Sequence, residues 1–269
     1  MRLSGETVAV VTGAGSGIGR SLALDLASRG ASLALADVNA PALETTRDLA
    51  RGAGQVTLHR VDVSSEDAVS TLAREVESAH GRVTLLVNNA GVALGGTFDE
   101  VSLEDLRWIV GVNFWGTVYG CEFFLPLLRR EGAAHIVNVS SVFGLMAPPG
   151  QTGYAASKFA VRGFSEALRH ELAGSNVGVS VVHPGGVRTG IARSARAGSR
   201  SGRDPARIAR EVADFERTFV TSPGDAAARI LRGVERGEPR ILIGRDAQVI
   251  DLAVRLWPTR YLRVLERLT

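Results

Sequence analysis

The sequence predicts an α/β fold in which one doubly wound parallel sheet of about seven strands carries helices on both faces. Three observations predict it. Short β-branched runs alternate with longer amphipathic stretches along most of the 269 residues, and such alternation implies parallel strands joined by right-handed crossovers. The first apolar run, 7–13, ends in a glycine-rich turn that opens a helix, as the first strand of a doubly wound sheet does. No linker composition divides the chain, so we expect a single domain over 1–269.

The first half of the chain supplies four strands with helices between them. Strands are expected at 7–13, 31–37, 55–63 and 83–91, and helices at 18–30, 41–54 and 64–81. The helix boundaries have local signals. Gly30 follows the first helix, Pro41 suits the first turn of the second, and serines followed by acidic residues open the third.

The second half continues the alternation, with two irregular segments. A helical stretch over about 102–130 contains GVNFWG at 111–116, where glycine and asparagine lower the helix propensity. The segment 190–222 is rich in Arg, Ser, Gly and Ala and follows a strand, so it predicts a mobile lid over a ligand cleft. The remaining strands are expected at 133–141, 177–186 and 240–244, and the remaining helices at 154–173 and 223–237.

Composition argues against several function classes. Hydrophobic residues make up 45% of the chain, which permits a full core. The single cysteine, Cys121, excludes an internal disulfide and a cysteine-rich zinc site and suits a cytoplasmic location. We assign no metal, because the five histidines do not cluster with acidic residues at metal-ligand spacing. The basic residues are interspersed with acidic ones, so we expect no nucleic-acid partner despite a pI near 9.6.

The glycine-rich turn VTGAGSGIG, 11–19, predicts a phosphate-binding loop. Gly13, Gly17 and Gly19 permit positive φ and a close approach of the backbone to a ligand. Ser16 and Ile18 lie between these glycines, at the start of the helix. The free N–H groups and the positive dipole end of that helix suit a pyrophosphate. A tight structural turn would use glycines too, but the position after the first strand favours a dinucleotide cofactor.

Two carboxylates end neighbouring strands of the predicted sheet. Asp37 ends the second strand, 18 residues after Gly19, where a carboxylate can bind both hydroxyls of an adenosine ribose and repels a 2′-phosphate. This favours NAD over NADP, although the nearby Arg20 keeps NADP open as the alternative. Asp62, followed by Val63, closes the third strand and would meet the adenine edge or cap the next helix.

The segment TGYAASKFAV, 152–161, places a phenol and an amine one helical turn apart. Tyr154 and Lys158 stand at i and i+4, so they share one helix face. A phenol has a pKa of about 10, and a nearby ammonium lowers that value by favouring the phenolate. The pair therefore predicts a general acid or base with its tuning cation, and an ordinary surface helix is the alternative.

Four motifs in this order and spacing resemble the short-chain dehydrogenase/reductase family over about residues 5–190. They are TGAGSGIG (12–19), NNAG (88–91), YAASK (154–158) and HPGGVRT (183–189). The resemblance implies a Rossmann fold, a nicotinamide cofactor, a homodimer or homotetramer, and a catalytic group of Asn, Ser, Tyr and Lys. By position these are Asn113, Ser141, Tyr154 and Lys158, because Ser141 rather than Ser140 lies 13 residues before the tyrosine.

The resemblance also implies a role for each residue. Tyr154 exchanges the proton while hydride moves between the carbinol carbon and the nicotinamide, Lys158 also binds the nicotinamide ribose, Ser141 holds the substrate oxygen, and Asn113 orders a water that links the lysine to solvent. The further cofactor contacts are Asn89, Ala90 and Gly91 on the adenosine side, Pro184 and Gly185 in the turn after the sixth strand, and Val187 and Thr189 at the carboxamide.

These observations predict an NAD(H)-dependent oxidoreductase that interconverts a hydrophobic secondary alcohol and its ketone. The segments expected to face the substrate, 92–98 and 142–151, are mostly apolar, and the lid at 190–222 lies over them. Two alternatives remain. One is an NADPH-dependent ketoreductase, and the other is a cofactor-binding regulator that kept the fold without turnover.

The C-terminal tail, 246–269, predicts an amphipathic helix interrupted by Pro258. It packs on its own domain or a neighbouring subunit, or else its basic rim rests on an anionic membrane surface. The first apolar stripe is Val249, Leu252, Ala253, Leu256 and Trp257, and the second is Tyr261, Leu262, Leu265 and Leu268, flanked by Arg260, Arg263 and Arg267.

Overall fold

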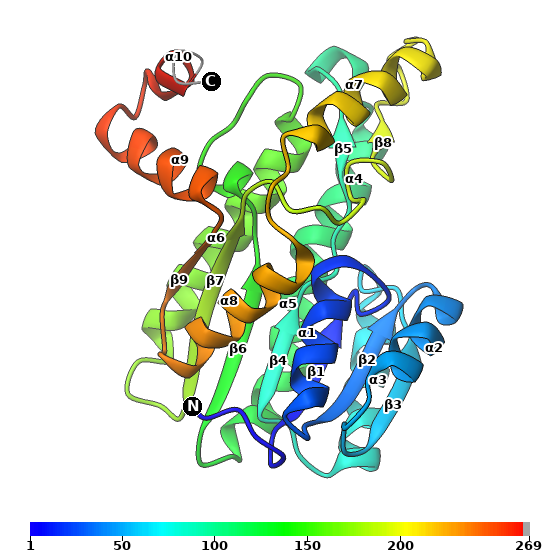
Figure 1. Ribbon diagram of the computed structural model, residues 1–269, viewed down its shortest axis with the longest axis vertical. Coiled ribbons are helices and arrows are strands. Elements are labelled where there is room, and N and C mark those ends of the chain that lie inside the picture. Colours follow the sequence, from blue (N-terminus) through cyan, green and yellow to red (C-terminus); the bar gives the residue numbers. More distant parts are fainter. Residues whose placement is uncertain (266–269) are drawn as a thin grey trace.

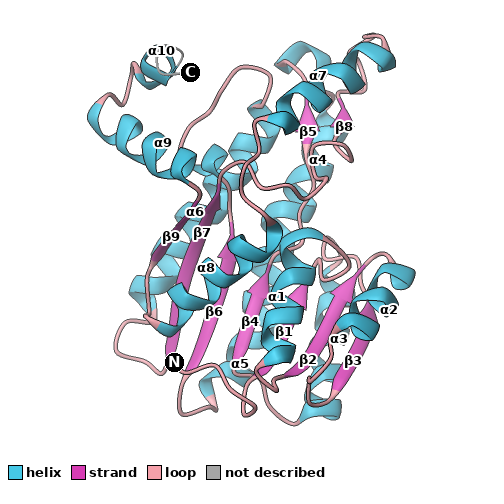
Figure 2. Cartoon of the chain, in the orientation of Figure 1, coloured by secondary structure: helices cyan, strands magenta, loops and turns pink. Residues whose placement is uncertain are grey.

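The computed structural model describes residues 1–265 of the 269 and contains, within them, a seven-stranded parallel sheet (Figures 1 and 2). The strand order is β3-β2-β1-β4-β6-β7-β9. This arrangement confirms the predicted fold class. The strands are β1 (Val8–Thr12), β2 (Ser32–Asp37), β3 (Val56–Arg60), β4 (Leu85–Asn88), β6 (Ala134–Val139), β7 (Val177–Pro184) and β9 (Arg240–Ile243).

Helices cover both faces of the sheet and enclose a hydrophobic core on each side. Successive residues of β1 alternate between the two cores, with Ala9 and Val11 in the first and Val10 in the second, as the pleat of a strand requires. One face carries α1 (Gly17–Ser28), α2 (Ala40–Leu49) and α8 (Pro223–Glu235), and the other carries α3 (Glu66–His80), α5 (Gly116–Arg129) and α6 (Thr152–Glu171).

The strand order reverses between β1 and β4, and this reversal decides where a ligand can bind. In β1, Val10 pairs with Ala34 of β2 on one side and with Leu86 of β4 on the other. The connections from these two strands leave in opposite directions, so a crevice opens at their carboxyl ends. The glycine-rich turn after β1 and the NNAG segment after β4 both lie at this edge.

The helical stretch 102–130 contains the expected irregularity as a single π-helical turn. It consists of α4 (Leu103–Val110), a π turn (Gly111–Trp115) and α5. The π turn carries Asn113, which is buried. Single π turns often mark functional sites because they redirect side chains that a regular helix would present elsewhere.

The segment 190–222 is more ordered than its composition suggests. It contains a short strand, β8 (Arg196–Ala197), which pairs in parallel with β5 (Leu94–Gly95), and a helix, α7 (Pro205–Arg217). The sequence predicted neither β5 nor β8, because two-residue strands have no periodicity to detect. Helix α7 lies above the carboxyl edge of the main sheet (Figure 1).

The C-terminal tail forms α9 (Arg245–Leu256) and α10 (Tyr261–Leu265), which project from the body of the protein (Figure 1). Of the first apolar stripe only Ala253 is buried, whereas Val249, Leu252, Leu256 and Trp257 are exposed. Packing of this stripe on its own domain is therefore confirmed for Ala253 and wrong for the four large side chains. Arg267 and Leu268 lie outside the described residues. Of the helices in residues 1–265, none has the length and apolar character needed to cross a bilayer.

Candidate active site

The loop between β1 and α1 is tight enough to favour glycine at three of its positions. Gly13 and Gly17 have φ of +65° and +52°, and a Cβ on Gly19 would stand 2.2 Å from the Gly13 carbonyl oxygen. Helix α1 begins at Gly17 after Ser16 and has no acidic residue in its first turn. The cradle therefore fits an anionic pyrophosphate at a helix N-terminus.

Asp37, at the end of β2, is held in place by two backbone donors. The N–H of Gly15 donates to Oδ2 at 2.9 Å and that of Asn39 donates to Oδ1 at 3.0 Å. Arg20, the residue that kept NADP open, is engaged elsewhere. Its Nε donates to Thr46 Oγ1 at 3.0 Å and its Nη2 donates to the carbonyl oxygen of Gly15. The glycine loop and α2 therefore already use this guanidinium.

The NNAG segment fastens the end of β4 to the end of β1. Asn89 Nδ2 donates to the Thr12 carbonyl oxygen at 2.9 Å, and the backbone N–H groups of Asn89 and Ala90 both donate to Thr12 Oγ1 at 3.0 Å. At the third strand, Asp62 Oδ1 accepts from the backbone and hydroxyl of Ser64. Ser65 rather than Asp62 caps α3.

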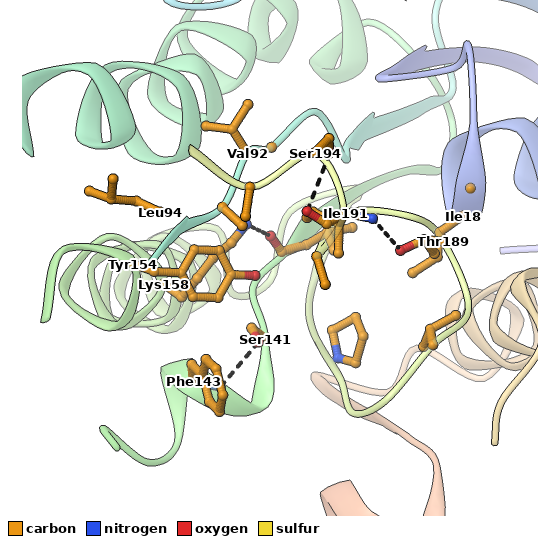
Figure 3. Close-up of a pocket in the computed structure, with 18 of the residues that line it drawn as sticks. Ile18, Val92, Leu94, Ser141, Phe143, Tyr154, Lys158, Thr189, Ile191 and Ser194 are labelled. Atoms are coloured by element: carbon orange, nitrogen blue, oxygen red, sulfur yellow. Dashed lines mark hydrogen bonds between the residues drawn. The ribbon is translucent and has the colours of Figure 1, made fainter. Parts of the chain in front are cut away.

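Tyr154, Lys158 and Ser141 line one wall of the same cavity (Figure 3). Tyr154 and Lys158 lie on α6, with Lys158 Nζ 5.8 Å from the centre of the Tyr154 ring. Lys158 Nζ also donates to the Val139 carbonyl oxygen at 3.1 Å. Ser141 follows β6, and its Oγ accepts the N–H of Phe143 at 3.1 Å. The edge of the Phe143 ring packs against the Tyr154 ring.

Burial dominates the titration of both residues on α6. It raises the pKa of the Tyr154 phenol above its usual range, and a hydrogen bond with Ser141 acts in the opposite direction. Burial also lowers the pKa of Lys158 to about 8. The sequence predicted a lowered pKa for the phenol. For the chain on its own that prediction is wrong, because the phenolate loses its hydration in this site and Lys158 does not offset that loss.

Asn113 does not line the cavity, and its side-chain amide is fully used by the protein. Its Oδ1 accepts the Val92 N–H at 2.8 Å, and its Nδ2 donates to the Val92 carbonyl oxygen at 3.1 Å and to Ser157 Oγ at 3.0 Å. Gly91 lies between Asn113 and Lys158, since a Cβ there would stand 3.2 Å from Asn113 Oδ1 and 3.3 Å from Lys158 Nζ. Asn113 therefore holds the chain after NNAG against α6.

The cavity has a volume of about 1190 Å³, which exceeds that of an ordinary small-molecule site. Its walls hold every cofactor contact that the sequence predicted except Gly19, which is buried beneath the loop. These residues are Gly13, Ser16, Gly17, Ile18, Asp37, Asp62, Val63, Asn89, Ala90, Gly91, Tyr154, Lys158, Pro184, Gly185, Val187 and Thr189. They come from the carboxyl ends of β1, β2, β3, β4 and β7 and from α6.

The rest of the cavity is mostly apolar and draws on elements far apart in the chain. Sequence reasoning missed Trp108 of α4 and Ile250 of α9, because nothing local marks a helical residue that faces a cavity rather than the core. Apolar residues in this part are Val92, Leu94, Trp108, Phe143, Met146, Val212, Phe215, Phe219 and Ile250. Within residues 1–265, no three His, Cys, Asp or Glu side chains gather as a metal site would require.

His183 is a further residue that the sequence did not assign to the site. It is fully buried on β7, and its Nδ1 lies 2.9 Å from the Ser141 carbonyl oxygen. A carbonyl oxygen only accepts, so Nδ1 carries the hydrogen. Burial lowers the pKa of His183 to about 4, so the ring is neutral at pH 7. This contact holds the backbone that presents the Ser141 hydroxyl to the cavity.

A family model and two named relatives all match most of the chain. A family model described as short chain dehydrogenase matches residues 7–200. A Mycobacterium tuberculosis protein that carries the name oxidoreductase SadH is 45% identical over 261 residues, which are 96% of this chain and 93% of SadH. A Bacteroides thetaiotaomicron protein named 3-ketodihydrosphingosine reductase is 30% identical, covering 93% of this chain and 92% of its own.

Solved structures agree with these sequence matches. A short-chain dehydrogenase/reductase from Burkholderia phymatum, crystallised in complex with NAD, superposes with a TM-score of 0.82. It is 38% identical, and the match covers 90% of each chain.

Proposed function

Since this chain belongs to the short-chain dehydrogenase/reductase family, we propose that it is an NAD(H)-dependent oxidoreductase that interconverts a hydrophobic secondary alcohol and its ketone. One observation carries the proposal. Tyr154 and Ser141 line the same cavity as the glycine loop and the apolar side chains, and Figure 3 shows both of them beside Phe143. A carbonyl or carbinol group held there would lie between the two hydroxyls and the site for a nicotinamide.

The choice of NAD rests on the adenosine end of the cavity. The Asp37 carboxylate lines it and is fixed by Gly15 and Asn39. A carboxylate there accepts hydrogen bonds from ribose hydroxyls and repels a phosphate. Arg20 is occupied by Thr46 and the Gly15 carbonyl, which supports NAD rather than NADP. A nicotinamide bound in this cavity would supply the hydride acceptor or donor.

The residues of the chain would then handle the proton and the substrate oxygen. In the reducing direction, Ser141 donates a hydrogen bond to the ketone oxygen and Tyr154 gives its phenolic proton to that oxygen. In the oxidising direction, Tyr154 accepts the proton of the alcohol. Burial raises the pKa of Tyr154, so the phenol is protonated at neutral pH, which is the form that a ketone reduction needs.

Lys158 supports this exchange from the same helix face. Its charge near the phenol favours the phenolate left behind after protonation of a ketone, and its Nζ borders the part of the cavity where a nicotinamide ribose would lie. Asn113 contributes by holding Val92 and Ser157 in place. We therefore propose that its side chain acts on the shape of the site, in place of the water-ordering role that the resemblance implies.

The substrate class follows from the apolar wall formed by Trp108, Phe143, Met146, Phe215 and Phe219. Burial of a hydrophobic substrate against these side chains contributes about 25 cal/mol per Å² of buried apolar area to the free energy of binding.

A cofactor-binding regulator without turnover remains the second candidate function.

The test follows the absorbance of NADH over a panel of apolar and charged ketones, with NADPH in parallel. The wild type should reduce apolar ketones, and Tyr154→Phe should lower kcat by about 10³-fold without changing the affinity for NADH. Tyr119→Phe is the matched control, because Tyr119 stacks on Trp115 outside the cavity. A wild type that binds NADH but reduces no ketone would support the regulator.

A further inference from the structure

The outward face of α9 exposes a continuous apolar stripe. Val249, Leu252 and Leu256 lie at i, i+3 and i+7, and they are 46%, 57% and 57% exposed, so they share one side of the helix. Trp257, directly after the helix, is 45% exposed. Monomeric proteins rarely leave neighbouring large apolar side chains uncovered, and such patches mark an interaction surface.

The charges of α9 and α10 are distributed unevenly between the outer and inner faces. Arg245, Arg260 and Arg263 are exposed, and none of them enters an ion pair with another described residue. The two carboxylates of residues 245–265 are both turned inward. Asp246 Oδ2 accepts the Gly186 N–H at 2.6 Å, and Asp251 pairs with arginines. Within residues 245–265, the outer surface therefore combines apolar and cationic side chains without an unpaired carboxylate.

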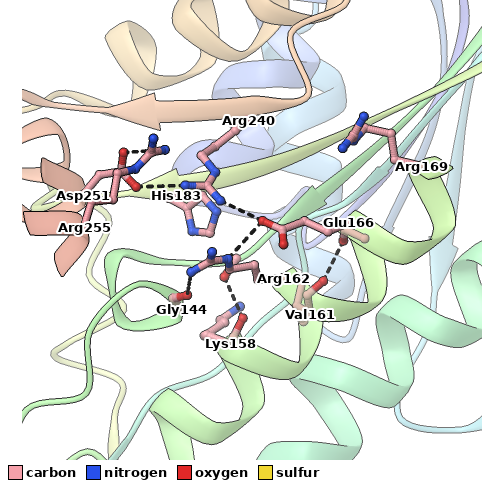
Figure 4. A network of polar contacts seen from close by, with 12 residues as sticks. Gly144, Lys158, Val161, Arg162, Glu166, Arg169, His183, Arg240, Asp251 and Arg255 are labelled. Atoms are coloured by element: carbon pink, nitrogen blue, oxygen red, sulfur yellow. Dashed lines mark hydrogen bonds and ion pairs between the residues drawn. The ribbon is translucent and has the colours of Figure 1, made fainter. Parts of the chain in front are cut away.

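The inner face of α9 is fixed to the catalytic helix, which determines the direction of the outer face. Arg240 bridges Asp251 of α9 at 2.9 Å and Glu166 of α6 at 2.8 Å (Figure 4). Glu166 is also paired with Arg162 at 3.0 Å. Beside this network, Ile250 of α9 lines the cavity. The helix cannot roll to bury its stripe without breaking these contacts.

From this arrangement we propose that α9 and α10 rest on an anionic membrane surface, with the stripe of Val249, Leu252, Leu256 and Trp257 at the boundary between headgroups and acyl chains. A basic amphipathic helix with a tryptophan is the form that lies in this boundary. Within residues 245–265 this face carries unpaired arginines and no unpaired carboxylate, so a surface of anionic groups complements it. An anionic bilayer offers acidic headgroups that attract these arginines.

The test is co-sedimentation of the full chain with two kinds of vesicle, one of phosphatidylcholine alone and one that also contains phosphatidylglycerol. The wild type should pellet with the anionic vesicles, and added salt should release it. Leu252→Glu combined with Leu256→Glu should lower the partition coefficient by about tenfold or more. Arg260→Gln and Arg263→Gln should each lower it by about fivefold on anionic vesicles only.

Leu49→Glu is the matched control, because Leu49 is 52% exposed at the end of α2. Its binding should equal that of the wild type. Two results would overturn the proposal. In the first, the wild type stays in the supernatant with both vesicle types. In the second, the double Leu→Glu variant dissociates an oligomer in light scattering and still pellets with anionic vesicles as the wild type does, which would assign the stripe to a second copy of the chain. Neither result depends on turnover, so the proposed activity is tested separately.

Discussion

The carboxylate of Asp105 accepts hydrogen bonds from both the backbone N–H and the hydroxyl of Ser199, at 3.0 and 2.6 Å, across 94 positions in the chain. The same oxygen accepts from the backbone and hydroxyl of Ser102 at the start of α4. Close by, the guanidinium of Arg196 lies 3.8 Å from the centre of the Trp108 ring, which lines the cavity. Asp105 therefore fastens the first part of the 190–222 segment to the wall of the cavity.

We predict that Asp105→Asn loosens this wall. Asp105 is 3% exposed, and the Ser199 hydroxyl holds the pKa of its carboxyl well below the usual range. All of these hydrogen bonds go to one oxygen, and a neutral amide oxygen accepts them more weakly than a carboxylate, so the variant should lose about 2 kcal/mol of stability. Residues 194–200 should exchange their amide hydrogens faster, and KM for bulky apolar ketones should rise more than kcat falls.

The control for Asp105 is Asp99→Asn, a change of the same kind at an exposed site nearby. It should leave both exchange and KM unchanged. In the wild type, the amides of 194–200 should exchange more slowly than those of 201–204. Equal rates in the two segments would show that Asp105 does not order residues 194–200.

This part of the fold marks the limit of what the sequence could predict. The strands, helices and glycine loop have local signals, and the predicted order placed Asp37, Asn89 and Tyr154 around one cavity. The contact between Asp105 and Ser199 has no such signal. The sequence around Asp105 predicts a helix cap with or without a hydrogen bond from a distant serine. Trp108 and Ile250 were missed for the same reason. The shift in the pKa of Tyr154 depends on burial, which the spacing of Tyr154 and Lys158 does not show.

A second prediction concerns cofactor choice. Asp37→Ala removes the carboxylate that would bind the adenosine ribose, and a hydrogen bond to a charged group contributes about 1.5–3 kcal/mol. The ratio of kcat/KM with NADH to kcat/KM with NADPH should therefore fall by about tenfold or more. Because Asp37 also anchors Gly15, the thermal stability of the variant is measured beside its kinetics. Asp62→Asn, in the same cavity, should leave the ratio unchanged, and an equal fall there would contradict the role of Asp37.

The third prediction is acid destabilisation through two buried histidines. Burial lowers the pKa of His135 and of His183 to about 4, against about 6.5 in an unfolded chain. Between these values the unfolded state binds more protons, so stability falls as pH drops from about 6.5 to about 4. Each histidine should account for about 3 kcal/mol of that loss.

Urea unfolding at pH 7 and pH 4.5 measures this effect. His183→Asn keeps a donor for the Ser141 carbonyl, and His135→Gln keeps a partner for Ser180. Each variant should show a shallower loss of stability with falling pH. His170→Gln, at an exposed site, should follow the wild type. Identical slopes in all four proteins would mean that neither buried ring titrates in this window.

The last prediction is that the chain gives up stability to hold Lys158 in the site. Burial lowers the pKa of this lysine to about 8, against 10.5 for the free side chain, which corresponds to about 3 kcal/mol. The cost is fully present below pH 8, where Lys158 is protonated in both the folded and the unfolded state, and it is relieved as pH rises from about 8 to 10.5.

Lys158→Met should therefore stabilise the protein at pH 7 by about 2 kcal/mol, once about 1 kcal/mol is subtracted for the Val139 carbonyl left without its donor. The advantage should disappear near pH 10.5, while turnover is lost at every pH. Lys158 is the one lysine among the 31 lysines and arginines of the chain, so its rate of reaction with an amine-directed reagent reports its pKa once peptide mass spectrometry separates it from the N-terminal amine. A midpoint near 10.5, or a Lys158→Met variant less stable than the wild type at pH 7, would show that the site accommodates the ammonium without cost.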